Sequence, residues 1–329
     1  MIKIVIISIL LSATLLLGSC KSDGQSPPTE GQTNLVPASS MQGVKPTDFD
    51  PPASAPKAPH VDGNRAFQYT KEIVDFGSRP IGSENHKKVE NYILGKLKGV
   101  TVDEDAFQAQ TAAGSFPMRN IIAKFPGKKD GIIVIGSHYD TNLPLPKNFV
   151  GANDGASTSG LLLELADQLK HWNRDGYSVW LVWFDGEEAT VKWTAEDSLY
   201  GSKHLAQKWQ QDGAARKVKA FILLDMIGDK DLDILRDGNS TPWLLDVIYH
   251  AAEKLGYQSH FFQEQSAIED DHLPFAKLGI PVADVIDLNY GYNNVFHHSV
   301  EDTMDKLSPQ SLQIVGDTVL ETLRMLDTR

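Results

Sequence analysis

The chain has 329 residues, 41% of them apolar, and its 31 basic and 43 acidic side chains give a formal net charge of -12. A chain of this length can bury a substantial core, and an α/β fold of this size often forms one domain. The acidic balance argues against a nucleic-acid partner, because binding phosphate groups requires a basic face.

The N-terminus has the pattern of a lipoprotein signal peptide. Met1-Ile2-Lys3 supplies a basic start, and residues 4–17 form an apolar run that is too short to span a bilayer comfortably. Leu17-Gly18-Ser19-Cys20 is similar to a bacterial lipoprotein box, in which the cysteine sulfur receives the lipid. We therefore expect a signal peptide over residues 1–19 and a lipidated Cys20. The protein would reside in the cell envelope, as a periplasmic or outer-membrane lipoprotein that meets the membrane through its lipid only.

Cys20 is the only cysteine in the chain. A disulfide within one chain is therefore excluded, and so is a thiol nucleophile in the mature domain. Residues 21–60 hold eight of the 17 prolines with many Ser, Gly and Thr residues, and they show no apolar periodicity. We expect residues 20–60 to form a disordered or extended tether and residues 61–329 to form one folded domain.

Helical and strand patterns alternate along this domain. Helical patterns cover 65–76, 84–97, 155–171 and 240–255, and a last helix begins at Ser308, which can cap it, with Pro309 in its first turn. The apolar strands are Arg119–Phe125, Ile132–Ser137, Ser178–Phe184, Ala220–Met226 and Pro281–Ile286. Near-continuous apolar strands between helices indicate an α/β fold with a largely parallel central sheet covered by helices on both faces.

Acidic and histidine side chains follow several of these strands. They lie in His138-Tyr139-Asp140, in Asp185-Gly186-Glu187-Glu188 and at Asp225. Open α/β sheets place their sites at the edge where parallel strands end, so these side chains should lie close together. Histidine and carboxylate groups are zinc ligands, and a catalytic zinc site keeps three protein ligands and one open position. This edge is therefore the candidate active site.

Single residues of this set have ordinary interpretations too. Asp154 lies just before a helix start, and an aspartate there caps the helix more often than it binds a metal. Two adjacent glutamates after an apolar strand, Glu187 and Glu188, suggest a metal ligand beside a general base. A lone histidine such as His298 belongs more often to the surface or the core, so its assignment depends on resemblance to known proteins.

Six short motifs occur in an order that resembles the zinc-dependent glutaminyl cyclases, within the wider clan of di-zinc aminopeptidases. The motifs are HYD (138–140), GANDGAS (151–157), FDGEEA (184–189) followed by Trp193, LLDMIGD (223–229), IEDDHLPF (268–275) and HHSVEDT (297–303). The likeness spans residues 65–329. It implies a mixed sheet flanked by helices and a single zinc ion held by Asp154, Glu188 and His298 in a catalytic zinc domain.

The resemblance also implies the reaction, which is cyclisation of the N-terminal glutamine of peptides or proteins to pyroglutamate with release of ammonia. In that reaction Glu187 would move the proton, and Asp225 and Asp270 would form a hydrogen-bonded relay with it. Trp193 and Ile268 would enclose the methylene part of the glutamine. Without the resemblance, these residues have ordinary structural interpretations. Asp225 would be an acidic residue in a turn, Asp270 would cap a helix, and Trp193 would be an aromatic residue that packs within a loop.

The sequence departs from the cyclase pattern at His297, where the family commonly has tryptophan. Either the wall of the substrate pocket differs there, or His297 is the zinc ligand. In the cyclases the zinc histidine precedes an aspartate by four positions, as His298 precedes Asp302. The resemblance therefore favours His298 as the ligand and leaves His297 in the substrate pocket.

The histidine of the HYD motif leaves a second function possible. His138 and Asp225 match the positions that bind a second metal in aminopeptidases of the clan, so a di-zinc aminopeptidase that hydrolyses the first peptide bond is the main alternative. A non-catalytic binding lipoprotein of the cell envelope is the third.

Overall fold

The computed structural model describes residues 44–329. The predicted signal peptide over 1–19, the lipidation site Cys20 and the predicted tether up to residue 43 lie outside the described residues. Within residues 44–329, no helix is long and apolar enough to cross a membrane.

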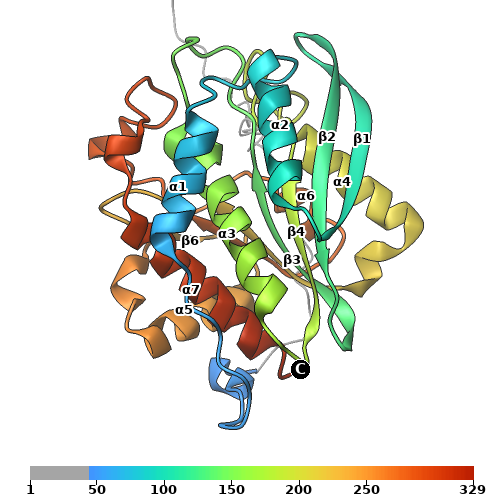
Figure 1. The fold of residues 1–329 in the computed structure, drawn as a ribbon, viewed down its shortest axis with the longest axis vertical. Helices are drawn as coiled ribbons and strands as arrows, with labels where there is room; N and C mark the ends of the chain where they lie inside the picture. Colours follow the sequence, from blue (N-terminus) through green and yellow to red (C-terminus); the bar gives the residue numbers. More distant parts are fainter. Residues whose placement is uncertain (1–43) are drawn as a thin grey trace, which may run out of the picture. The chain divides into compact units, whose positions relative to one another are not determined.

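Six strands form the central sheet, in the spatial order β1-β2-β4-β3-β5-β8 (Figure 1). They are β1 (Thr101–Thr111), β2 (Gly114–Phe125), β3 (Lys129–His138), β4 (Tyr177–Phe184), β5 (Val218–Asp225) and β8 (Val282–Ile286). The pairs β4·β3, β3·β5 and β5·β8 are parallel, whereas β1·β2 and β2·β4 are antiparallel. The predicted mixed, largely parallel sheet is confirmed. A separate parallel pair joins β6 (Ile234–Asp237) to β7 (Phe261–Ser266).

Helices cover both faces of the sheet, as predicted. They are α1 (Gly63–Val74), α2 (Glu84–Lys96), α3 (Thr158–His171), α4 (Tyr200–Asp212), α5 (Pro242–Leu255), α6 (Leu273–Ala276) and α7 (Pro309–Leu326). Successive side chains of a strand point to opposite faces, so β3 feeds two cores. Ile133 and Ile135 belong to the larger core, and Ile132 and Val134 belong to the smaller one.

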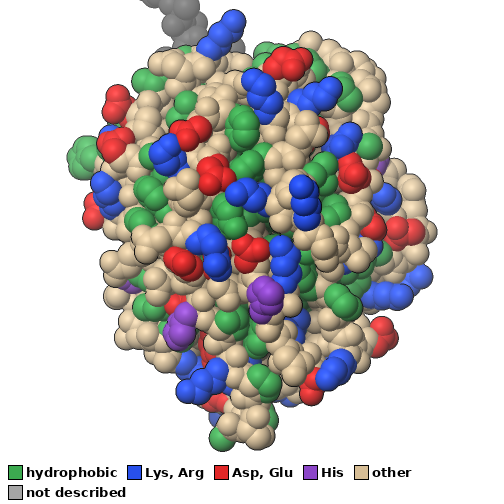
Figure 2. Space-filling view, in the orientation of Figure 1, with side chains coloured by type: hydrophobic (Ala, Val, Ile, Leu, Met, Phe, Trp, Pro, Cys, Tyr) green, Lys and Arg blue, Asp and Glu red, His purple; other side chains and the backbone are tan. Residues whose placement is uncertain are grey.

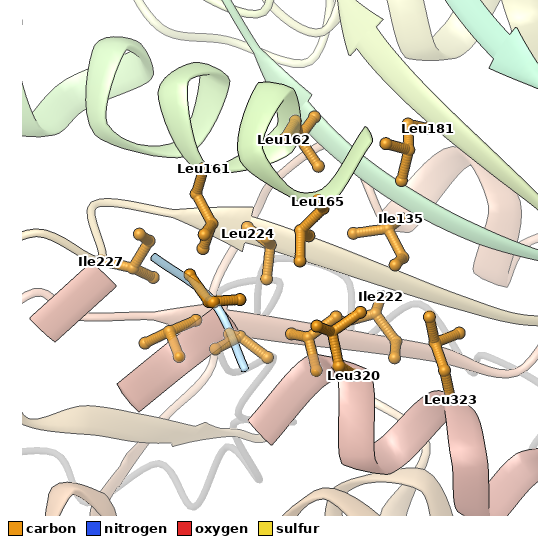
Figure 3. Close-up of a cluster of buried hydrophobic side chains, with 14 of the residues drawn as sticks. Ile135, Leu161, Leu162, Leu165, Leu181, Ile222, Leu224, Ile227, Leu320 and Leu323 are labelled. Carbon is orange, nitrogen blue, oxygen red and sulfur yellow. The ribbon is translucent and has the colours of Figure 1, made fainter. Parts of the chain in front are cut away.

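The larger core lies between the sheet and helices α3 and α7. Figure 3 shows Leu161 and Leu165 of α3 gathered with Ile222 of β5 and with Leu320 and Leu323 of α7. All five side chains are fully buried. Each such aliphatic side chain contributes about 1.5–3 kcal/mol when it leaves water, so this face fixes α3 firmly against the sheet.

The smaller core lies on the opposite face and contains a group of aromatic side chains among its aliphatic ones. Phe275 of α6 contacts Phe184 of β4 and Phe221 of β5, with ring centroids 5.9 and 4.9 Å apart. Trp209 of α4 packs on Phe275 at 5.4 Å. The two cores hold β3, β4 and β5 rigidly between them, and the ends of these three strands carry the candidate site.

The last part of the predicted tether, residues 44–60, contacts the domain before α1 begins. Pro46–Phe49 form a short 3-10 helix, and Phe49 is buried with its ring stacked on Trp243 of α5 at 5.7 Å. Asp50 accepts a hydrogen bond from Lys254 at 2.8 Å. Among residues 44–60 only Phe49 is buried, and the others are half-buried or exposed. The boundary at residue 60 stays a prediction.

Charges of both signs are intermixed on the face of the domain seen in Figure 2, where Lys and Arg side chains alternate with Asp and Glu. That face therefore presents no extended field of one sign to a charged partner.

Candidate active site and metal centre

The sheet order brings the predicted motifs to one edge. His138 is the last residue of β3, Asp225 is the last residue of β5, and Asp185 directly follows β4. Because β3 lies between β4 and β5, the three strand ends are neighbours. The candidate site therefore sits at the carboxyl edge of the parallel strands, where the sequence places it.

Two of the three predicted zinc ligands, Asp154 and Glu188, each lie close to the third, His298. His298 Nε2 is 3.3 Å from Asp154 Oδ2 and 3.1 Å from Glu188 Oε1. Asp154 and Glu188 are buried, whereas the side chain of His298 is 33% exposed. The ring of His297 lies 3.9 Å from that of His298 and hydrogen-bonds to Asn294 instead. His298 thus makes both carboxylate contacts.

A second group of donors shares Asp154. His138 Nε2 is 3.1 Å from Asp154 Oδ1 and 3.4 Å from Asp225 Oδ1. One donor atom from each of His138, Asp154 and Asp225 falls within 4.8 Å of the others, which is the spacing of a metal-ligand set. Asp154 therefore stands between two sets of donors.

The chemistry of these donors fits zinc, which binds imidazole nitrogen and carboxylate oxygen. Both ring nitrogens of His138, Asp154 Oδ2 and Asp225 Oδ1 are buried and lack a hydrogen-bond partner among residues 44–329. Burial opposes protonation of His298, but the charges of Glu188 and Asp154 outweigh it and raise its pKa to about 11. The carboxylates thus favour a positive charge here, and a bound cation would supply it.

Asp302 supports the loop that carries Asp154. Its carboxylate accepts the backbone N–H of Asn153 at 2.7 Å and that of Asp154 at 3.2 Å, and the hydroxyl of Tyr290 donates to it at 2.8 Å. Burial and the charge of Asp154 raise the pKa of Asp302 to about 7. Groups that orient a metal ligand in this way tune its affinity for the metal.

The turn that carries Glu187 and Glu188 is held by two other aspartates. Asp140 accepts the backbone N–H groups of Glu187 and Glu188 at 3.2 and 3.4 Å. Asp185, at the start of the turn, contacts His86 through its Oδ1 atom, which lies 2.7 Å from Nε2 of the histidine ring. Gly186, which lies between Asp185 and Glu187 in sequence, has a φ of 63°, a conformation that costs glycine little. The turn is thereby fixed at both ends.

The predicted proton-transfer groups are buried carboxyl groups with raised pKa values. Burial and the charge of Glu188 raise the pKa of Glu187 well above its ordinary value. Burial and the charges of Asp225 and Asp271 do the same for Asp270. Buried carboxyl groups with raised pKa values are suited to taking up and releasing a proton in acid–base chemistry.

Two predicted substrate residues, Ile268 and Trp193, are not among the candidate metal-ligand groups of residues 44–329. Ile268 is buried in a small apolar cluster with Met226 and Ile286. Trp193 is half-buried, and among the described residues it makes no hydrogen bond or ring contact with the metal donors. Its loop is shaped by Asp197, which accepts the backbone N–H groups of Thr190, Val191 and Lys192.

Asp237 is a supporting residue that sequence reasoning missed. It accepts the backbone N–H of Ile268 at 2.9 Å and lies 3.2 Å from Nε2 of His272, so it holds both ends of the segment that contains Asp270. All of these partners lie far from Asp237 in sequence. A buried acid near the end of a short strand gives no local signal of such a role.

Comparisons with known proteins agree with this geometry. The sequence model of peptidase family M28 matches residues 120–323. A glutaminyl-peptide cyclotransferase from Bothrops jararaca is 32% identical over 286 residues, which cover 74% of this chain and 77% of the relative.

Two solved structures are also similar to the chain. One is a glutaminyl cyclase from an Acidobacteriales bacterium, with 49% identity and a TM-score of 0.82, covering 85% of this chain and 99% of that one. The other is a leucine aminopeptidase precursor from Bacteroides thetaiotaomicron, with 28% identity and a TM-score of 0.73, covering 82% and 98%.

Proposed function

The chain belongs to peptidase family M28 and to the glutaminyl-peptide cyclotransferases, and from this membership we propose that it converts N-terminal glutamine of peptides and proteins to pyroglutamate. The α-amine nitrogen attacks the carbon of the glutamine side-chain amide, the bond to the amide nitrogen breaks, and ammonia leaves. The observation that carries the proposal is the set of Asp154, Glu188 and His298 beside the buried Glu187.

We assign the catalytic zinc ion to Asp154, Glu188 and His298. The distances of 3.1 Å from His298 to Glu188 and 3.3 Å from His298 to Asp154 support this assignment, and three protein ligands leave one position for substrate. Zinc bound there would supply Lewis-acid polarisation of the side-chain amide oxygen. Asn142 donates to the second oxygen of Glu188 at 2.8 Å and so orients the carboxylate that would hold the zinc ion.

Glu187 is the residue to which we assign proton transfer. Its raised pKa makes it a stronger base than an exposed glutamate, and it can still return a proton. Glu187 takes the proton of the α-amine as the new C–N bond forms and gives it to the departing nitrogen. The proton is conserved over the cycle, and no water is consumed.

Asp270 and Asp225 form the proposed relay behind Glu187. The charge of Asp225 raises the pKa of Asp270, and the charge of Asp270 in turn raises that of Glu187. Burial and these charges thus favour the protonated form of Asp270, and a carboxylic acid kept neutral by its surroundings can donate a hydrogen bond.

Substrate recognition is assigned to Trp193, Ile268 and His297. The glutamine side chain must curl until its amide carbon lies beside its own amine, and apolar walls favour that pose over an extended one. Holding the two reacting groups together in this way can supply several kcal/mol of the barrier.

Replacing Trp193 with alanine is expected to raise KM for a Gln-initiated peptide by roughly tenfold, the effect of losing one apolar pocket wall. Zinc content should not change, because Trp193 contacts no metal donor. Trp172→Ala is the matched control, since Trp172 is also half-buried but packs against the larger core. Steady-state kinetics decide the matter, and equal KM values for the two variants would remove Trp193 from the substrate pocket.

The donor set His138, Asp154 and Asp225 favours a second candidate, a di-zinc aminopeptidase. The two enzymes differ in metal content and product. Metal analysis of the purified protein combined with an ammonia assay on a Gln-initiated peptide separates them. One zinc ion with ammonia supports the cyclase, whereas two zinc ions with free amino acid would establish the peptidase. A non-catalytic binding protein would give neither product. The buried acidic residues around Glu187 argue against this third alternative.

We further propose that the protein is lipid-anchored in the cell envelope through Cys20, as a periplasmic or outer-membrane lipoprotein. The support is the apolar run over 4–17 followed by Leu17-Gly18-Ser19-Cys20. Cys20→Ala should move the protein from the membrane fraction to the aqueous fraction, because alanine has no sulfur to which the lipid can be attached. Fractionation of expressing cells measures this, with Ser19→Ala as the control. A Cys20→Ala protein that stays with the membrane would refute the anchor.

A further inference from the structure

Arg79 is a fully buried cation next to the metal centre that has no part in the mechanism above. It lies between α1 and α2, and its guanidinium donates hydrogen bonds to four backbone carbonyls. Nε donates to Tyr139 at 2.7 Å, and Nη2 donates to Gly151 at 2.9 Å and to Asp154 at 3.0 Å. Nη1 donates to Val150. One side chain therefore joins the end of β3 to the loop that carries Asp154.

The glycines of the Asp154 loop leave the space for this guanidinium. Gly151 and Gly155 have φ values of 51° and 79°, where a side chain is strained. A Cβ atom at either position would also lie 3.3 or 3.2 Å from Nη2 of Arg79. The close approach of the loop backbone thus requires glycine on both sides of Asp154, and the guanidinium occupies the concave side of the loop.

The charges around Arg79 favour the same arrangement. Burial lowers its pKa to about 10, while the charges of Asp154, Asp302 and Asp140 act in the opposite direction. The guanidinium therefore remains protonated at neutral pH. A fixed positive charge behind the loop offsets the repulsion among buried carboxylates, which is costly when it is left uncompensated.

We propose that Arg79 is a positioning residue of the metal centre. Its planar fork holds the carbonyls of Tyr139, Gly151 and Asp154 in one arrangement and so fixes the Asp154 carboxylate relative to His138. Zinc affinity then depends on the shape of the guanidinium and not only on its charge. The inference rests on the proposed function in one respect, namely that the metal is zinc.

The test replaces Arg79 with lysine, which keeps the charge but removes the planar fork. The variant is expected to bind zinc roughly ten- to hundredfold more weakly, which is the usual effect of losing a group that orients a metal ligand. Competition with a chromophoric chelator measures the affinity of the zinc-free protein without relying on activity.

Arg174→Lys is the matched control. Arg174 is also mostly buried, with 8% of its side chain exposed, and it forks onto Asp327 and donates to the carbonyl of Tyr177 at 2.8 Å. It lies just before β4, at the opposite end of the strand from the site. Arg174→Lys should lower the melting temperature and leave zinc affinity unchanged.

Parental zinc affinity in Arg79→Lys would overturn the proposal, and so would an equal loss in Arg174→Lys, since the effect would then be general destabilisation. If Arg79→Lys does not fold, Thr141→Val serves instead, because Thr141 Oγ1 accepts the backbone N–H of Arg79 at 2.9 Å. That variant should weaken zinc binding by a smaller factor, and an unchanged affinity would contradict the proposal. If the parental protein binds zinc but releases no ammonia from a Gln-initiated peptide, the proposed function is refuted and the proposal about Arg79 is not affected.

Discussion

Replacing Glu187 with glutamine is expected to lower kcat by roughly a thousandfold, within the range that general acid–base groups contribute. Glutamine has nearly the same shape as glutamate, but it cannot carry the proton from the amine to the leaving nitrogen. The backbone N–H of residue 187 would still donate to Asp140, so the turn should persist. Zinc binding should stay at the parental level, because the assigned ligand is Glu188.

Glu188→Gln is the matched control for this variant. It changes the neighbouring residue in the same way, yet it should lose zinc as well as turnover, since Glu188 contacts His298 directly. Metal analysis and single-turnover kinetics on both proteins give the comparison. A Glu187→Gln protein that cyclises a Gln-peptide at the parental rate would show that another residue moves the proton.

The pH dependence of kcat/KM offers a further check on Glu187. Because its pKa is raised, the rate should begin to fall at a higher pH than the ordinary glutamate value of about 4.3 as the solution is acidified. The base must be deprotonated to accept the amine proton, so activity is lost as pH decreases through the raised pKa. Residual turnover of Glu187→Gln should lack this acidic limb.

Replacing His298 with asparagine is expected to weaken zinc binding by roughly a thousandfold, because one ligand accounts for about 3–4 kcal/mol of a zinc affinity near 10–16 kcal/mol. Asparagine is the suitable replacement since residue 298 has a φ of 51°, a conformation that asparagine tolerates. Activity should disappear with the metal and return in part when zinc is added in excess.

His297→Asn is the control, and it also separates the two adjacent histidines. His297 lies beside His298 but hydrogen-bonds to Asn294, so its replacement should keep zinc and change KM. Competition with a chelator measures the zinc affinity of the two variants. Retained zinc in His298→Asn together with lost zinc in His297→Asn would reverse the assignment of the ligand.

The parallel strands could be predicted from sequence because they are buried on both faces. Residues 132–137 and 178–184 are apolar almost without a break, which is typical of the interior of an α/β sheet. Strand β1 escaped prediction because its side chains alternate between exposed and buried and include Asp103, Glu104 and Asp105. Helix α4 escaped because it starts after Leu199 without a side-chain cap and carries many polar residues.

The ends of the strands could be predicted for the same reason. His138, Glu188 and Asp225 each follow or end an apolar run, and parallel strands bring such ends together. Family resemblance then placed Asp154 and His298, which are distant in sequence and carry no strand signal. The structure brings these residues within contact distance of one another.

The supporting residues could not be predicted because their roles depend on contacts across the chain. Arg79 binds carbonyls that are 60 to 75 positions away, and Asp302 binds the backbone of Asp154 across 148 positions. In sequence, Arg79 is an arginine before a proline and Asp302 is an acid in a loop. Only the fold shows that both are buried around the metal loop.

The central claim is that the amine of glutamine, and not water, attacks the side-chain amide. Mass spectrometry of a Gln-initiated peptide after reaction in heavy-oxygen water tests it most directly. Cyclisation predicts a peptide that is lighter by one ammonia and contains no heavy oxygen. A shortened peptide with free glutamine, or a product that carries heavy oxygen, would contradict it, because each of these requires water as the nucleophile.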